Sequence, residues 1–335
     1  MRPGFLQACR RYGITGTWQG LMKLKKLVMV VLLIVLTSLL AFGYFYFIRQ
    51  DPLETVKGIN PAVKLNKPPK FLYAINSEPA HPLDRPAAVM VVNQRIYVSD
   101  VGKGLVAVYD YNGKFESYLR PGTRNFASPY GLASDGKNLY VADPGLHQIF
   151  VFDANGKYLR TFEPQGVRLG APGAMLFHQD RLYVSDQPVH KVYAFAPSGA
   201  LLQSYGSQGH GEGQLYFPHG IAVDEGGKVY VADSGNDRIE VYNSDGSSAG
   251  AIGGDQMSTP RGLFCDRKGN FWLVAGMANR VFVYGSDSKK VLEFGNYGPD
   301  YGQISLPNGI FLDKSGRLYI TEMGNSRVSV FSLND

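Results

Sequence analysis

Residues 217–241 read FPHGIAVDEGGKVYVADSGNDRIEV, and this stretch decides the fold. It opens with Pro-x-Gly and continues through two apolar runs that are separated by the turn sequence Asp-Glu-Gly-Gly. The second run ends at Asp233, a polar turn follows, and a third run begins at Arg238. A fourth short run covers residues 249–252. Short apolar runs with Gly- and Asp-rich turns between them predict four antiparallel strands in a meander.

The same unit recurs along the chain. Each copy begins with a proline, namely Pro86, Pro129, Pro172, Pro218, Pro260 and Pro307. Its second run reads Tyr-Val-x-Asp or a near match and ends at Asp100, Asp143, Asp186, Asp233, Ala275 and Glu322. The six copies follow one another at about forty residues, the period typical of β-propeller blades. The sequence therefore predicts an all-β fold, a six-bladed β-propeller with four-stranded antiparallel blades.

Two copies resemble a known repeat closely. Residues 206–224, GSQGHGEGQLYFPHGIAVD, together with residues 229–239, VYVADSGNDRI, resemble the NHL repeat. Residues 294–310, FGNYGPDYGQISLPNGI, with GNSRV at 324–328, form the second close copy. The resemblance extends over residues 69–335 and implies the propeller fold. NHL-like propellers include binding scaffolds, sensors and a few enzymes, so the resemblance leaves the function open.

Residues 27–48 form a run of 22 residues without a charge. At about 1.5 Å per residue, such a run spans a hydrocarbon core of about 30 Å. Lys23, Lys25 and Lys26 directly precede it, which predicts a cytoplasmic N-terminus and an exported C-terminus. The competing interpretation is a cleaved signal peptide, but the run is long for one and no small-x-small cleavage site follows it. We therefore predict one transmembrane helix that serves as a signal anchor.

The chain is expected to comprise a basic cytoplasmic tail (1–26), the transmembrane signal anchor (27–48), a linker (49–68) and the propeller (69–335). The sixth repeat holds only three strands, and the isolated apolar run KFLYAI at 70–75 is predicted to supply the fourth. That pairing would close the ring and leave no large exposed sheet edge. The protein is expected in the cytoplasmic (inner) membrane, with its propeller in the periplasm or outside the cell.

The formal net charge of +6 belongs to the N-terminal segment. Residues 1–48 hold six basic residues and no acidic one, which leaves 28 basic against 28 acidic residues in the rest of the chain. A formally neutral propeller lacks the positive surface that binds phosphate backbones, so no nucleic-acid partner is expected.

The middle residues of the Pro-x-Gly units are predicted to ring one mouth of the central channel. They are Ala87, Tyr130, Gly173, His219, Arg261 and Asn308. Tyr130, His219, Arg261 and Asn308 are polar or aromatic and come from four different repeats. Polar groups that converge on one concavity are typical of a ligand site, so these four residues form the predicted ligand-binding set. The alternative is that they are ordinary polar residues on a solvated face.

Three further features are interpreted as structural. The acidic residue that ends the second strand recurs in nearly every repeat, so it is predicted to accept N–H groups of the following turn rather than to catalyse. His147 and His190 occupy nearly equivalent places in adjacent repeats, and we interpret them as solvated side chains rather than as a metal-binding pair. Cys265 is interpreted as a small buried hydrophobic residue.

These residues favour a non-catalytic function. The amidating lyases that resemble this family gather several histidines around a metal, whereas here only His219 stands in a Pro-x-Gly position. A calcium lactonase would need Glu, Asp and Asn at the channel, and only Asn308 is of that kind. The sequence predicts a membrane-tethered binding or scaffold module for a protein, peptide or glycan, with no catalytic residues and no cofactor. The alternative is a metal-dependent hydrolase or lyase with a single divalent ion in the channel.

Overall fold

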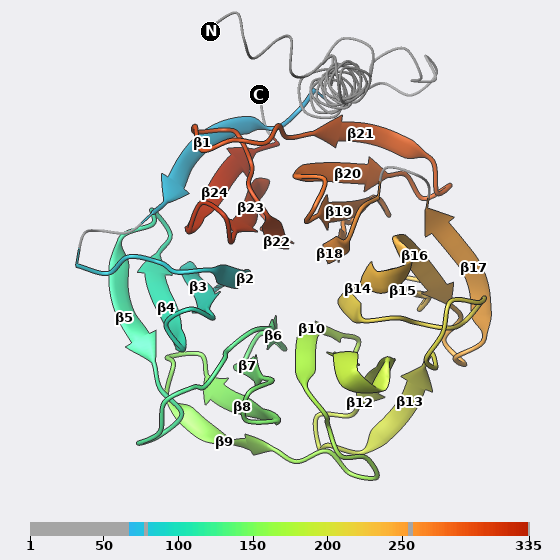
Figure 1. The fold of residues 1–335 in the computed structure, drawn as a ribbon. Helices are drawn as coiled ribbons and strands as arrows, with labels where there is room; N and C mark the ends of the chain where they lie inside the picture. The colour runs from blue at the N-terminus through green and yellow to red at the C-terminus, as the bar shows by residue number, and fades with distance from the viewer. Residues whose placement is uncertain (1–66, 77–79, 254–256, 334–335) are drawn as a thin grey trace, which may run out of the picture. The chain divides into compact units, whose positions relative to one another are not determined.

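The computed structural model describes residues 67–76, 80–253 and 257–333 (Figure 1). The predicted cytoplasmic tail, signal anchor and nearly all of the linker lie outside these residues. Within the described ranges, no helix has the length and apolar character needed to cross a membrane.

The described residues form 24 strands in six four-stranded sheets, each sheet being one blade. In chain order the first three blades are β2(Pro86–Val92), β3(Arg95–Asp100), β4(Leu105–Asp110), β5(Phe115–Leu119); β6(Leu132–Ser134), β7(Asn138–Asp143), β8(Gln148–Asp153), β9(Tyr158–Phe162); and β10(Pro172–His178), β11(Arg181–Asp186), β12(Lys191–Phe195), β13(Leu201–Tyr205). The last three are β14(Pro218–Val223), β15(Val229–Asp233), β16(Arg238–Tyr242), β17(Ser248–Gly253); β18(Pro260–Cys265), β19(Phe271–Ala275), β20(Arg280–Tyr284), β21(Lys290–Phe294); and β22(Pro307–Leu312), β23(Arg317–Glu322), β24(Arg327–Ser332), β1(Lys70–Ile75). The all-β, six-bladed prediction is confirmed.

The last blade is completed by the first strand of the ring. β1 pairs antiparallel with β24, from Lys70 opposite Ser332 to Ile75 opposite Val328. Figure 1 shows β1 beside β24 on the outside of this blade, and β2, β6, β10, β14, β18 and β22 nearest the centre. Both ends of the ring are thereby held in one sheet, in which β1 covers the edge that β24 would otherwise expose.

The Pro-x-Gly units have a steric basis. Proline opens five of the six inner strands, where a missing N–H costs no ladder bond. The glycines lie where neighbouring inner strands approach closely: a Cβ on Gly220 would stand 2.3 Å from the Arg261 carbonyl oxygen, and one on Gly309 would stand 2.6 Å from that of Ala87. The third position is Gly in four blades and Ala in the other two, at Ala88 and Ala174, whereas the middle residue differs in all six.

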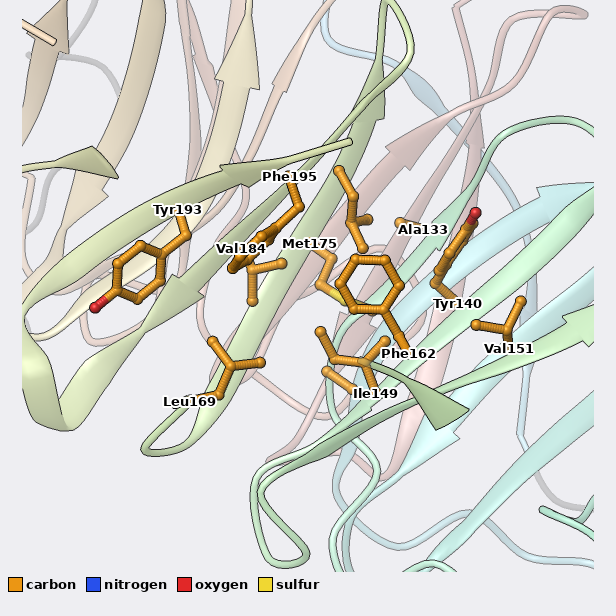
Figure 2. Close-up of a cluster of buried hydrophobic side chains, with 12 residues drawn as sticks. Ala133, Tyr140, Ile149, Val151, Phe162, Leu169, Met175, Val184, Tyr193 and Phe195 are labelled. Carbon is orange, nitrogen blue, oxygen red and sulfur yellow. The ribbon is translucent and has the colours of Figure 1, made fainter. Parts of the chain in front are cut away.

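The core lies between adjacent blades, because successive side chains of a strand point to opposite faces of the sheet. In β7, Leu139 and Val141 face the first blade, whereas Tyr140 and Ala142 face the third. Figure 2 shows the second of these contact layers, in which Tyr140 and Phe162 lie near Met175. The alternating apolar pattern of each strand therefore fills two interfaces and positions the inner strands rigidly around the axis.

The acidic residues at the ends of the second strands mainly hold the loop that leads into their own blade. Asp143 accepts from the backbone N–H groups of Ala127 at 2.7 Å and Ser128 at 3.0 Å. Asp186 accepts from Gly170 and Ala171 in the same way, at 2.7 and 2.8 Å. Bonds to the following turn also form, as between Leu146 N and Asp143 at 3.1 Å. The carboxylates thus join the loop that precedes the blade to the turn after the second strand, whereas the sequence predicted contacts to that turn alone.

Candidate functional site

The structure brings the four predicted site residues together. His219, Arg261 and Asn308 are the second residues of β14, β18 and β22, and Tyr130 lies just before β6. Because inner strands of different blades start side by side around the axis, residues up to 178 positions apart in sequence touch one another. Tyr130, His219 and Arg261 line one cavity, whereas Asn308 is buried and does not line it. We call the four residues together with this cavity the channel mouth.

The contacts form one connected network. The Tyr130 hydroxyl donates to Asn308 Oδ1 at 2.9 Å, and Asn308 Nδ2 donates to the Ala87 carbonyl at 2.8 Å. His219 Nδ1 lies 3.4 Å from the Tyr130 hydroxyl, and Arg261 Nη1 lies 3.1 Å from His219 Nε2. Each side chain is held by at least one neighbour from another blade, so the channel mouth is a preformed surface.

This network fixes the protonation state of His219. A guanidinium can only donate, so Nε2 of the ring must accept from Arg261. The proton then belongs on Nδ1, from which it points to the Tyr130 oxygen, whose own hydrogen is directed to Asn308. Burial, with a smaller contribution from the Arg261 charge, lowers the pKa of His219 to about 3. The imidazole is therefore neutral at physiological pH, and Arg261 supplies the positive charge.

Gln187 belongs to the channel mouth and was not predicted. It opens the short 3₁₀ turn Gln187–Val189 directly after β11, and its Nε2 lies 2.7 Å from His219 Nε2. Ser234 holds the equivalent place after β15 and donates to the Pro260 carbonyl. The sequence signal for both is their position immediately after the acidic residue that ends the second strand.

A cavity of about 420 Å³ opens between these groups. It is lined by Tyr130, Gln187, Phe217, His219, Ser234, Gly235, Thr259 and Arg261. Phe217 and Thr259 each precede a proline and yet have a φ of +53°, a left-handed conformation that a bulky or β-branched residue adopts at a cost. Phe217 is also 45% exposed. The same left-handed conformation precedes the proline at Arg85 and Leu306, so it belongs to the turn that leads into several blades.

The chemistry of the lining favours an anion over a cation. Arg261 has no carboxylate within 4 Å among the described residues, and none of the residues lining the cavity is acidic. Nor do the described residues hold a group of three or more His, Cys, Asp or Glu side chains arranged for a metal. A divalent ion at His219 Nε2 would have to sit beside the Arg261 guanidinium. The described residues that line this cavity therefore do not fit a divalent ion.

Two of the structural interpretations need correction. His190 is not a solvated side chain: it is buried, accepts from the Phe217 N–H at 3.1 Å, and stacks on Tyr216. His147 is exposed and contacts the Gly170 carbonyl instead of His190, so the two do not form a pair. Cys265 is only half-buried, because it lies at the end of β18 where the inner strand meets a second cavity. Burial raises the pKa of its thiol to about 12.

Comparisons with known proteins agree with this fold. A sequence model of the NHL repeat matches residues 215–242. No curated protein sequence matches the chain. Among solved structures, a gluconolactonase from Xanthomonas campestris is 20% identical, covers 83% of this chain and 99% of its own, and has a TM-score of 0.60.

Two further solved structures are similar in fold. Virginiamycin B lyase from Staphylococcus aureus, in complex with quinupristin, is 13% identical, with 74% of this chain and 80% of that one covered and a TM-score of 0.55. A chain of the nidogen/laminin complex is 18% identical, with coverage of 64% and 81% and a TM-score of 0.54. At these identities the likeness concerns the fold alone. The chain is a six-bladed β-propeller that carries an NHL repeat in its fourth blade.

Proposed function

We propose that this protein is a membrane-tethered, extracytoplasmic binding module whose channel mouth takes an anionic group of a protein, peptide or glycan partner. The observation that carries the proposal is Arg261, a guanidinium at the cavity without an acidic partner among the described residues, backed by a neutral His219. A fixed guanidinium recognises a carboxylate through two parallel hydrogen bonds.

The surroundings of Arg261 suit a macromolecular partner. Phe217 and Leu306 are each 45% exposed, and Met277, in the turn between β19 and β20, is 64% exposed. Exposed aromatic and apolar side chains beside an arginine are the residue types that dominate binding energy at protein interfaces. Because the network holds Arg261 in place before any partner arrives, this side chain loses little entropy on binding.

Structural similarity alone does not decide between binding and catalysis. The similar structures comprise a gluconolactonase, a lyase and a member of the nidogen/laminin complex, so one fold serves both purposes. The enzymatic alternative requires a divalent ion, and the purified full chain should retain none after extensive dialysis. One equivalent of zinc, iron or calcium in elemental analysis would favour the hydrolase or lyase instead.

The tether is proposed from residues 27–48 and the lysines before them. Its test is a reporter fused after Asp335, with alkaline phosphatase active only if the propeller is exported. Activity of a cytoplasmic reporter at the same position would contradict this orientation.

Site-specific cross-linking tests the channel mouth directly. A photo-cross-linking amino acid at Phe217 should give an adduct in native membranes, whereas the same amino acid at Leu202, an equally exposed apolar residue of β13, should not. In the Phe217 background, Arg261→Gln should abolish the adduct and Arg261→Lys should retain part of it, because lysine keeps the charge but not the paired donors. An adduct that survives Arg261→Gln would refute the proposal.

A further inference from the structure

A second cavity lies at the opposite ends of the inner strands and has no part in the proposed channel-mouth function. The prolines that open these strands stand at the channel mouth, so the residues that end them face the other side of the ring. Met90, Leu176, Phe264 and Phe311, near the ends of β2, β10, β18 and β22, line this cavity of about 1570 Å³. We call it the distal cavity.

The distal cavity continues away from the axis, along the last two blades. Trp272 of β19 and Leu292 of β21 line it on one side, and Leu312 and Leu333 on the other. Pro68 and Pro69 line it as well, so the cavity reaches the point at which the chain enters the ring. The four named inner-strand side chains and the named residues of this extension are apolar, which suits an elongated apolar ligand rather than a compact polar one.

The rim of the distal cavity is positively charged. Its lining includes five cationic residues, Lys67, Lys70, Arg267, Lys268 and Lys314, against two acidic ones, Asp266 and Asp313. None of the five cations lies within 4 Å of a carboxylate among the described residues.

The two carboxylates are already engaged inside their turns. Asp266 accepts from Lys268 N at 2.8 Å and from Trp272 Nε1 at 3.0 Å. Asp313 accepts from Arg317 N at 2.9 Å and from the Tyr111 hydroxyl at 2.8 Å. Both carboxylates keep their charge, but the five cations outnumber them, so the rim retains a net positive charge that attracts an external anion.

We propose that the distal cavity binds an anionic membrane lipid, with an acyl chain along the apolar floor and the headgroup at Lys268 and Lys314. The apolar floor matches the acyl chain of such a lipid, and the cationic rim matches its headgroup. Each cation near an anionic membrane surface adds to the attraction. The short distance in sequence between the predicted membrane anchor and the cavity also supports a membrane lipid as the occupant. Only 18 residues, 49–66, separate the uncharged run 27–48 from Lys67 at the cavity. At no more than about 3.6 Å per residue, 18 residues reach at most about 65 Å, so this face can lie against a bilayer.

The test uses the full chain with lipid nanodiscs. One set contains only phosphatidylcholine, and the other contains added phosphatidylglycerol; a fraction of each lipid carries a photoactivatable acyl chain. With phosphatidylglycerol, label is expected in the peptides of β2, β18 and β22, together with slower amide exchange in the turns at 266–270 and 313–317. With phosphatidylcholine alone, both signals should be at least about tenfold weaker.

Charge reversal supplies the matched variants. Lys268→Glu/Lys314→Glu should reduce the labelling about tenfold, whereas Lys103→Glu/Arg124→Glu, which reverses two charges in loops on the channel-mouth side, should leave it unchanged. Lys268 and Lys314 are exposed turn residues, so the fold should survive, and thermal unfolding of both variants checks this. Arg261→Gln should not affect labelling, which separates this proposal from the channel-mouth function.

Several outcomes would overturn the inference. Equal labelling in both lipids would show that the rim does not select an anionic headgroup. Slow exchange without any label in β2, β18 or β22 would place the lipid on the surface and leave the cavity unoccupied. Protection of the same turns in lipid-free detergent that grows with protein concentration would identify a second copy of the chain as the occupant.

Discussion

The buried ion pair of the last blade gives the most sharply defined stability prediction. Arg327 Nε lies 3.0 Å from Glu322 Oε1, and the two side chains are 5% and 0% exposed. The terminal nitrogens of Arg327 donate to three carbonyls in the loop before β22, those of Pro299, Asp300 and Gln303, at 2.8 Å each. The Arg327→Leu variant removes all four contacts and leaves Glu322 buried without its cation.

The expected loss of stability follows from leaving the Glu322 carboxylate buried without a cation. Breaking a buried pair by removing one partner typically destabilises a protein by about 3–5 kcal/mol. For a domain of this size each kcal/mol shifts the midpoint by about 2–4 °C, so the unfolding temperature should fall by roughly 6–20 °C. Leucine fills much of the space of the arginine stem, so the loss reports the charge and the hydrogen bonds more than a cavity.

Arg280→Leu is the matched control. Arg280 Nη1 lies 2.8 Å from Glu293 Oε1, but these side chains are 20% and 11% exposed, and Lys290 also contacts Glu293 at 2.7 Å. Glu293 would keep a cation, so the loss should stay near 1 kcal/mol. Thermal unfolding of the full chain followed by circular dichroism measures both variants. Equal losses, or an Arg327→Leu loss below about 1 kcal/mol, would refute the reasoning.

Three further predictions concern the axis and two titrating groups. Gly220→Ala should lower the free energy of unfolding by about 1–3 kcal/mol in urea titrations, because its Cβ would stand 2.3 Å from the Arg261 carbonyl oxygen. Gly226→Ala should cost less than about 1 kcal/mol, because the nearest atom to its Cβ would be a side-chain oxygen of Asp224 at 3.3 Å. The His219 ring should show no titration between about pH 5 and 8 in nitrogen-15 NMR, and Arg261→Gln should raise its pKa from about 3, since one of the two causes is removed and burial remains. Burial raises the pKa of Asp100 to about 6 from 3.8, so the native state binds more protons than the unfolded chain between these values. The free energy of unfolding should therefore fall as pH rises from about 4 to about 6, by at most about 3 kcal/mol, and Asp100→Asn should flatten that slope in denaturation series at each pH.

The fold could be predicted because the same steric constraints recur in every repeat and so leave a periodic pattern in the sequence. Each repeat begins with a proline, and a small residue stands two positions later, Gly in four blades and Ala in two, so both positions are visible as a period. The missing strand of the last blade was predictable for a related reason: β24 would otherwise expose an edge, and only one unassigned apolar run existed to cover it.

The site was predictable only in part, because some of its members have no fixed place in the repeat. Tyr130, His219, Arg261 and Asn308 share one repeat position, and the closeness of the inner strands brings them together. Gln187 comes from a turn whose conformation differs between blades, so its direction depends on local backbone geometry. The burial of His190 likewise depends on Tyr216, a neighbour from the next blade that stacks on its ring.

The division of labour within Pro-x-Gly explains how one fold can hold different functions. The first position is proline in all six repeats, and the close approach of neighbouring inner strands limits the third to Gly or Ala. The middle residue is not subject to this steric constraint, since Ala87, Gly173 and Arg261 all occupy that position. The residues at these six middle positions can therefore differ between proteins, and alter what the channel mouth binds, without altering the propeller fold. In this chain those positions hold one permanent cation and no carboxylate, and that composition is the physical reason to expect an anionic partner.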